Sequence, residues 1–249
     1  MTTYVLVHGG WRGGWIYRPL ATRLRALGHV VYTPSLSGCA EHSHRLTGDV
    51  TLSTHIEDIA NLIRWEQLDD VVLVGHSYGG MVITAVADRE RQHVRGLVYL
   101  DAVVPSSGSS FVDMYPSQRE HFANAASENR GLYIDPIPSS YFGVRLENQN
   151  LVDSLATPFP LAAATERLVF ATEALEDLPK TFVLAEGWAA NPYVDNKERF
   201  ANDPNWSFHT APVGHDLMLE APELLVDVLT GPGSRTHSEH VRADSNVNG

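Results

Sequence analysis

Cysteine, lysine and long apolar runs are scarce in this sequence, and each scarcity excludes a class of protein. The single cysteine, Cys39, rules out an intramolecular disulfide, so no disulfide framework holds the fold. Only two lysines occur and the formal net charge is -12, which argues against nucleic acid or an anionic membrane as a partner, because both bind clustered cations. No apolar run approaches the roughly 18 residues that a membrane helix needs.

Targeting and metal-binding signals are also missing. The N-terminal residues lack the basic stretch and long apolar run of a secretory signal, so we expect a cytoplasmic protein. His42 and His44 lie in a polar loop without further ligands at a diagnostic spacing, so we expect no metal and no cofactor. A chain of 249 residues with 43% hydrophobic residues is large enough for one α/β domain or two small ones.

Apolar runs suited to strands alternate with helical patterns along the chain. Thr54, followed three residues later by Glu57, matches a capping box at the start of the second helix, and Gly28 matches a stop after the first. This alternation predicts an α/β fold, a mostly parallel sheet with helices on both faces. The predicted strands are 3–7, 29–34, 71–74, 94–100, 181–185 and 206–210, and a closing helix is predicted at 222–229.

The regular alternation lapses in the middle of the chain. Between about residues 105 and 178, serines and prolines interrupt short helical patterns, which indicates an insertion rather than a part of the sheet. We therefore expect a core formed by 1–104 and 179–230. The polar residues 231–249 are expected to form a disordered tail.

The strongest motif is Gly75-His76-Ser77-Tyr78-Gly79, which follows a run of four branched apolar residues and precedes a helical pattern. A serine held on such a strand-to-helix turn is exposed at the sheet edge, next to the backbone N–H groups of a helix N-terminus. Glycine on either side lets the neighbouring backbone approach closely. The motif predicts that Ser77 is a nucleophile for acyl transfer.

A serine nucleophile needs a base, and His215 is the candidate among the 12 histidines. It lies just past the last predicted strand, and therefore at the sheet edge where Ser77 must also lie. His76 adjoins the serine but is expected to point elsewhere. His8 is expected to brace the glycine loop by hydrogen bonding.

With His8-Gly9-Gly10, Gly75 to Gly80 and Gly214-His215-Asp216 in this order, the chain resembles the α/β-hydrolase superfamily. More narrowly, it resembles the branch of plant methylesterases, hydroxynitrile lyases and small bacterial esterases. The resemblance implies that the insertion 105–178 is a helical lid. It also implies that the backbone N–H groups of Gly10 and Tyr78 form the oxyanion hole.

The resemblance leaves two candidates for the acid that should orient His215. In much of the superfamily the acid follows the strand that is here 181–185, where Glu186 stands. Some members instead draw it from the end of the strand after the nucleophile helix, where Asp101 stands. We expect Asp101, with Glu186 as the rival.

These residues predict a serine hydrolase that cleaves small hydrophobic, even aromatic, carboxylic esters through an acyl-enzyme. Two alternatives stay open, namely carbon–carbon cleavage of the hydroxynitrile lyase type and non-catalytic binding of a small ligand. The expected partner is a small-molecule ester, with no nucleic acid or membrane, and a homodimer is possible. The residues expected to bind the substrate are aromatic: Trp11, Trp15, Phe111, Tyr141, Phe142 and Trp188.

Overall fold

The computed structural model describes residues 1–115 and 119–231. Its main sheet has six strands, all parallel, in the order β2-β1-β3-β4-β7-β8. This arrangement confirms the predicted α/β class and all six predicted strands, within one or two residues at their ends. The strands are β1 Thr3–Val7, β2 Val30–Tyr32, β3 Val71–His76, β4 Val94–Leu100, β7 Lys180–Ala185 and β8 Trp206–Ala211.

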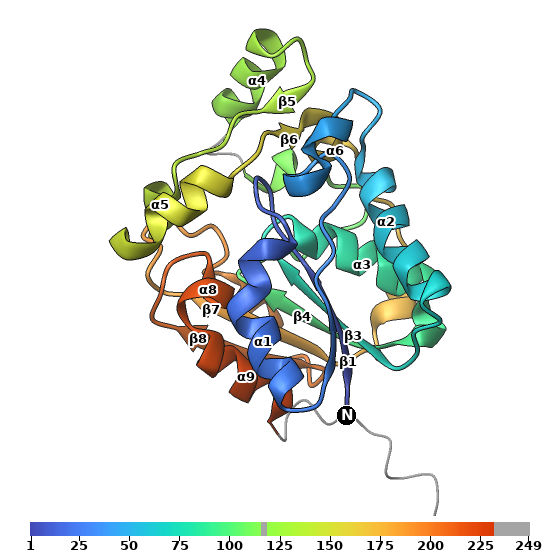
Figure 1. Ribbon diagram of the computed structural model, residues 1–249. Coiled ribbons are helices and arrows are strands. Elements are labelled where there is room, and N and C mark those ends of the chain that lie inside the picture. Colours follow the sequence, from blue (N-terminus) through green and yellow to red (C-terminus); the bar gives the residue numbers. More distant parts are fainter. Residues whose placement is uncertain (116–118, 232–249) are drawn as a thin grey trace, which may run out of the picture.

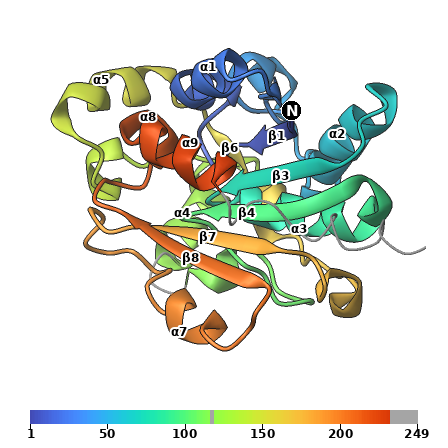
Figure 2. The ribbon, with the colours of Figure 1, turned by 90° about the horizontal axis from the view of Figure 1, so that it is seen from below.

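Helices cover both faces of this sheet because its central strands are apolar on both sides; every residue of β3 is buried. Helix α1 (Arg18–Ala26) packs with α8 (Leu217–Glu220) and α9 (Pro222–Thr230) on one face. On the other face, α2 (Leu52–Trp65) packs on α3 (Gly79–Arg89), which contacts β1, β3 and β4. Figures 1 and 2 show the sheet between these two groups of helices.

The ends of two helices test the capping predictions. Gly28 follows Leu27, the C-cap of α1, and has a φ of +83°, a conformation that glycine adopts without strain, so the predicted stop is confirmed. The predicted capping box at Thr54 and Glu57 is wrong. Helix α2 begins one turn earlier, where the side chain of Thr51 accepts from the backbone of Thr54 and the Thr54 side chain accepts from the backbone of Thr51.

The described residues of 105–178 lie mostly toward the end of the molecule opposite the N-terminus (Figure 1). Within this segment, Thr172–Leu175 instead lies near the start of β4, where the carbonyl of Ala174 accepts from Nε of Arg91. The segment contains α4 (Arg119–Glu128), α5 (Leu146–Leu155) and α6 (Leu161–Thr165). A two-stranded antiparallel sheet of β5 (Tyr133–Ile134) and β6 (Phe159–Pro160) lies between them in sequence. The division into core and lid stays a prediction, and all but Gly231 of the predicted tail lies outside the described residues.

Short elements complete the chain. Helix α7 (Asn196–Phe200) precedes β8. None of the helices within the described ranges is long and apolar enough to cross a membrane. The 3-10 turns that the structure describes are Gly14–Tyr17, Ala40–Arg45, Arg91–His93, Val112–Met114, Ser139–Phe142 and Thr172–Leu175.

Candidate active site

Ser77 lies on the tight turn between β3 and α3, with a φ of +52° that residues other than glycine adopt at a cost in strain. The turn needs glycine on both sides. A Cβ on Gly75 would lie 2.7 Å from the carbonyl oxygen of Gly79, and a Cβ on Gly79 would lie 2.5 Å from that of Val7. The sequence therefore folds into this turn because its glycines let β1, β3 and α3 approach one another closely.

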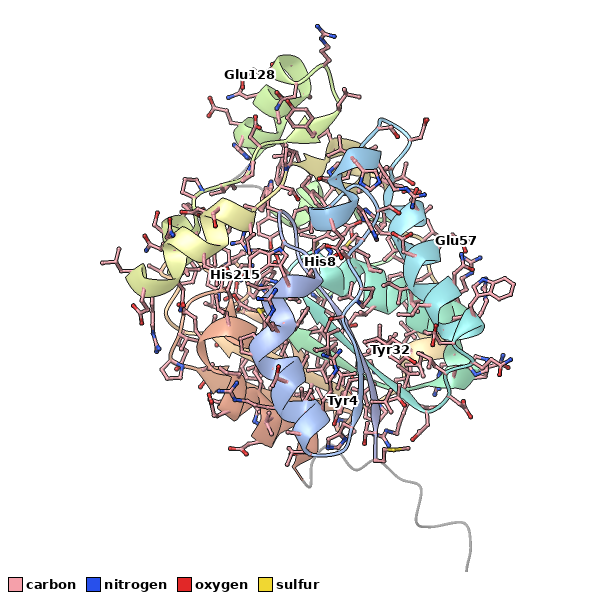
Figure 3. The ribbon with its side chains drawn as sticks, viewed as in Figure 1. Tyr4, His8, Tyr32, Glu57, Glu128 and His215 are labelled. Carbon is pink, nitrogen blue, oxygen red and sulfur yellow. The ribbon has the colours of Figure 1, made fainter. Side chains whose placement is uncertain are left out.

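His215 lies in the loop between β8 and α8, at the same edge of the sheet. Figure 3 shows it level with His8 at the end of β1, whereas Tyr4 lies at the opposite end of that strand. Its Nδ1 donates to Oδ2 of Asp101 over 2.6 Å, and both side chains are almost completely buried. The structure thus brings Asp101 and His215 together, although 114 positions separate them in sequence.

Asp101 directly follows β4 and has a φ of +44°. Its second oxygen, Oδ1, accepts hydrogen bonds from the backbone N–H of Ala185 at 3.0 Å and from Nδ2 of Asn191 at 2.7 Å. Both oxygens of the carboxylate are therefore satisfied, as burial of a charge requires. The side chain of Glu186, the rival acid, is exposed to solvent.

The two expected oxyanion donors belong to two chain segments that lie next to Ser77, the start of α3 and the loop after β1. Tyr78 follows it at the start of α3, where backbone N–H groups have no partner within the helix. Gly10 belongs to the loop after β1, and the neighbouring Gly9 is so close that a Cβ there would lie 2.6 Å from that of Ser77. The N–H groups of a helix end and of an adjacent loop can together hold a developing negative charge.

A buried polar chain holds the side chain of Tyr78 in place. Its hydroxyl donates to Nδ1 of His55 at 2.9 Å, and Nε2 of His55 donates to the carbonyl of Ser37 at 2.9 Å. Burial lowers the pKa of His55 to about 4, so the imidazole is neutral near pH 7 and can accept the bond from Tyr78.

The two other histidines of the site are also buried. His8 lies beside the glycine loop, where Nδ1 donates to the carbonyl of Gly9 and Nε2 accepts from the N–H of Leu36. Burial lowers the pKa of His8 to about 4. His76 donates from Nε2 to the backbone carbonyl of His215 at 3.0 Å, and its pKa falls well below 6.5 through burial and the nearby His215. Both rings therefore act here as neutral structural braces.

A pocket of about 410 Å³ of empty space, open solvent included, adjoins Ser77. Five of the six aromatic residues expected at the site line it, and Trp15 does not. No described residue that lines the pocket carries a charged side chain, so this lining suits a neutral, apolar group. Its lining consists of Trp11, Ser77, Phe111, Tyr115, Phe122, Ile137, Tyr141, Phe142, Trp188, Ala190 and Pro192.

Sequence reasoning missed Tyr115, Asn191 and an ion pair. Burial raises the pKa of Tyr115 well above its ordinary value, an effect partly offset by a hydrogen bond between its hydroxyl and Ser77. Arg12 forms a buried pair with Asp216, with Nη2 of the arginine 3.0 Å from Oδ2. A charged residue between glycines in an otherwise apolar loop was the available signal for Arg12, but nothing local pointed to Tyr115 or Asn191.

The chain is similar in sequence to known proteins. A family model described as "Alpha/beta hydrolase family" matches residues 4–228. Carbendazim hydrolyzing esterase from Nocardioides sp. is 38% identical over 94% of this chain and 100% of its own length. Salicylic acid-binding protein 2 of Nicotiana tabacum is 30% identical over 71% of this chain and 70% of its own.

A solved structure supports the same assignment. An extracellular α/β-hydrolase from a Paenibacillus species, described as a structural and functional homologue of the tobacco protein, has a TM-score of 0.80 and 24% identity. The comparison covers 92% of this chain and 98% of that one. The relatives include plant methylesterases, which confirms the branch that the motifs indicated. The chain therefore belongs to the α/β-hydrolase family.

Proposed function

We propose that this protein is a serine esterase, a carboxylic ester hydrolase in which Ser77, His215 and Asp101 form the catalytic triad. One observation carries the proposal. A serine on a strained strand-to-helix turn and a histidine–aspartate pair joined over 2.6 Å lie at one edge of one sheet. Relatives named as esterases and methylesterases support the same reaction.

The reaction follows from this geometry. His215 takes the proton of Ser77 as the serine oxygen attacks the ester carbonyl, and Asp101 holds Nδ1–H of the imidazole so that Nε2 is the basic nitrogen. The backbone N–H groups of Gly10 and Tyr78 stabilise the oxyanion, each contributing roughly 3 kcal/mol to the transition state. His215 then protonates the departing alcohol. Water, activated by the same histidine, releases the acid from Ser77.

The substrate is an uncharged ester with a flat aromatic or otherwise apolar acyl group. The described residues that line the pocket beside Ser77 are mostly aromatic and uncharged, and a charged acyl group would lose its hydration among them without gaining a partner. The name of the Nocardioides relative supports activity on an ester-type substrate. The segment 105–178 acts as the lid over this pocket, since Phe111, Phe142 and their neighbours supply much of its wall.

The experiment combines covalent labelling with turnover. The protein is expected to be labelled by a fluorophosphonate at Ser77, and Ser77→Ala is expected to abolish both labelling and turnover. Methyl and p-nitrophenyl esters of benzoate, butyrate and succinate test the acyl preference, and we expect benzoate to react fastest and succinate slowest. Equal rates across the panel would contradict the aromatic preference.

The two alternatives have outcomes of their own. A wild-type protein that is neither labelled nor active would be a binding protein, and release of cyanide from an aromatic cyanohydrin would indicate a lyase. A cytoplasmic location, the homodimer, and the absence of nucleic-acid and membrane partners stay predictions.

A further inference from the structure

Asn191 lies in the loop after β7 and is 7% exposed. Its side chain makes three hydrogen bonds. Nδ2 donates to Oδ1 of Asp101 at 2.7 Å and to the carbonyl of Ala185 at 2.9 Å, while Oδ1 accepts from the N–H of Tyr193 at 2.8 Å. The amide therefore connects its own loop to the ends of two strands, β4 through Asp101 and β7 through Ala185.

The amide makes one kind of bond within its own loop and another kind to a distant part of the chain. The acceptor Oδ1 bonds the backbone two residues on, which is the local bond that asparagine commonly makes in turns. The donor Nδ2 reaches outside the loop, to a carboxylate 90 positions away in sequence. A purely local turn residue needs only the first of these bonds, so the second requires a separate explanation.

The contact with Asp101 fixes which way the carboxylate faces. Oδ1 is held between the N–H of Ala185 and Nδ2 of Asn191, so Oδ2 is left directed at Nδ1 of His215. With Asn191 removed, one of the two donors to Oδ1 is lost in a site where Asp101 is fully buried. A hydrogen bond to a charged group is among the stronger bonds in proteins, so its loss changes the orientation and charge distribution of the carboxylate.

We propose that Asn191 is a positioning residue for the triad, which holds Asp101 in register with His215. The inference rests on the proposed function. It adds a residue of the loop after β7 to the site. This loop then has two roles, because Asn191 bonds Asp101 while its neighbours Ala190 and Pro192 line the substrate pocket.

The test separates the two hydrogen-bonding roles by two substitutions. Asn191→Ser keeps a side-chain oxygen that can accept from the N–H of Tyr193, but it is too short to donate to Asp101. Asn191→Ala loses both bonds. We expect kcat of both variants to fall by roughly 10- to 100-fold with KM changed less than about twofold, because the lost bond is to a charged group that acts in the transition state.

A double-mutant cycle, read out as kcat, distinguishes an effect that acts through Asp101 from a merely structural one. If Asn191 acts through Asp101, adding Asn191→Ser to Asp101→Asn lowers kcat no further. Asn196→Leu is the matched control. Asn196 is 9% exposed at the start of α7 and lies outside these contacts, and full kcat is expected in that variant.

Three results would overturn the proposal: full kcat in Asn191→Ser, a much larger loss in Asn191→Ala than in Asn191→Ser, or additive losses in the cycle. Thermal unfolding of each variant shows whether a loss of kcat comes from unfolding of the protein. Labelling of the wild-type protein by the fluorophosphonate is measured in parallel. A wild-type protein that is not labelled contradicts the proposed function, whereas a labelled one with an unaffected Asn191→Ser contradicts only this inference.

Discussion

At the scale of single residues, the orientation of His215 depends on which carboxylate it meets. Asp101 lies 2.6 Å from Nδ1 and is fully buried, whereas Glu186 is exposed. We expect Asp101→Asn to lower kcat on the order of 10⁴-fold, since an amide favours the wrong tautomer of the histidine. Glu186→Gln is the control and should retain wild-type kcat. The reverse pattern, measured by steady-state kinetics on a p-nitrophenyl ester, would contradict the assignment.

The choice between these two acids shows what the sequence could predict and what it could not. Both follow a parallel strand, so topology alone places both at the same sheet edge. The deciding facts are the positive φ of Asp101 and the donors from Ala185 and Asn191, which depend on contacts 84 and 90 positions apart. The turn that carries Ser77 was easier to predict, because its glycines and its flanking strand and helix are all local.

At the scale of elements, the buried pair of Arg12 and Asp216 joins the loop after β1 to the loop before α8. These loops carry the proposed oxyanion donor Gly10 and the proposed base His215. Nε and Nη2 of Arg12 both bond the carboxylate, and the two side chains are buried. The pair therefore ties together two parts of the site that lie about 200 positions apart in sequence.

Breaking this pair should be costly. We expect Arg12→Met to lower the free energy of unfolding by about 3–5 kcal/mol, because Asp216 is left buried without its partner. The double variant Arg12→Met, Asp216→Leu should recover a large part of that loss, because it removes both charges. Urea unfolding measures both effects.

A more exposed pair serves as the control for that experiment. Arg95 and Asp70 are joined at 2.9 Å, but 25% and 64% of their side chains are exposed. Asp70→Asn should therefore change the unfolding free energy by less than about 1 kcal/mol. Equal losses in Arg12→Met and Asp70→Asn would show that burial does not set the strength of the pair between the two loops.

The elements themselves were largely predictable, and the exceptions have physical causes. Central strands are buried on both faces, so they appear as continuous apolar runs that single-sequence reasoning detects. The start of α2 was misplaced because Thr51 and Thr54 cap it by a reciprocal threonine pair, a pattern that lacks the usual Glu or Gln. Trp15 was expected in the pocket because it follows the glycine loop, but it lies in the 3-10 turn Gly14–Tyr17 and is not among the lining residues.

At the scale of the whole molecule, the site lies at the carboxyl ends of the strands, where Phe111 and Phe142 of the segment 105–178 line its pocket. Several imidazole rings at this site are buried, so their protonation at acid pH affects the stability of the fold. Burial lowers the pKa of His8 and of His55 to about 4. Each ring accepts a hydrogen bond at one nitrogen, from Leu36 to His8 and from Tyr78 to His55, and protonation of that nitrogen removes the bond.

The sign of the pH effect follows from the direction of these shifts. The unfolded chain, with histidine pKa values near 6.5, binds more protons than the native state between about pH 6.5 and pH 4. The stabilising contribution is therefore complete above pH 6.5 and is lost as the pH falls toward 4, on the order of 3 kcal/mol for each histidine. Urea unfolding from pH 8 to pH 4.5 should show this loss. In His55→Gln the slope of stability against pH should decrease in that window, because one of the buried rings is removed. A wild-type unfolding free energy that stays constant from pH 7 to pH 4.5 would contradict the role of these buried rings.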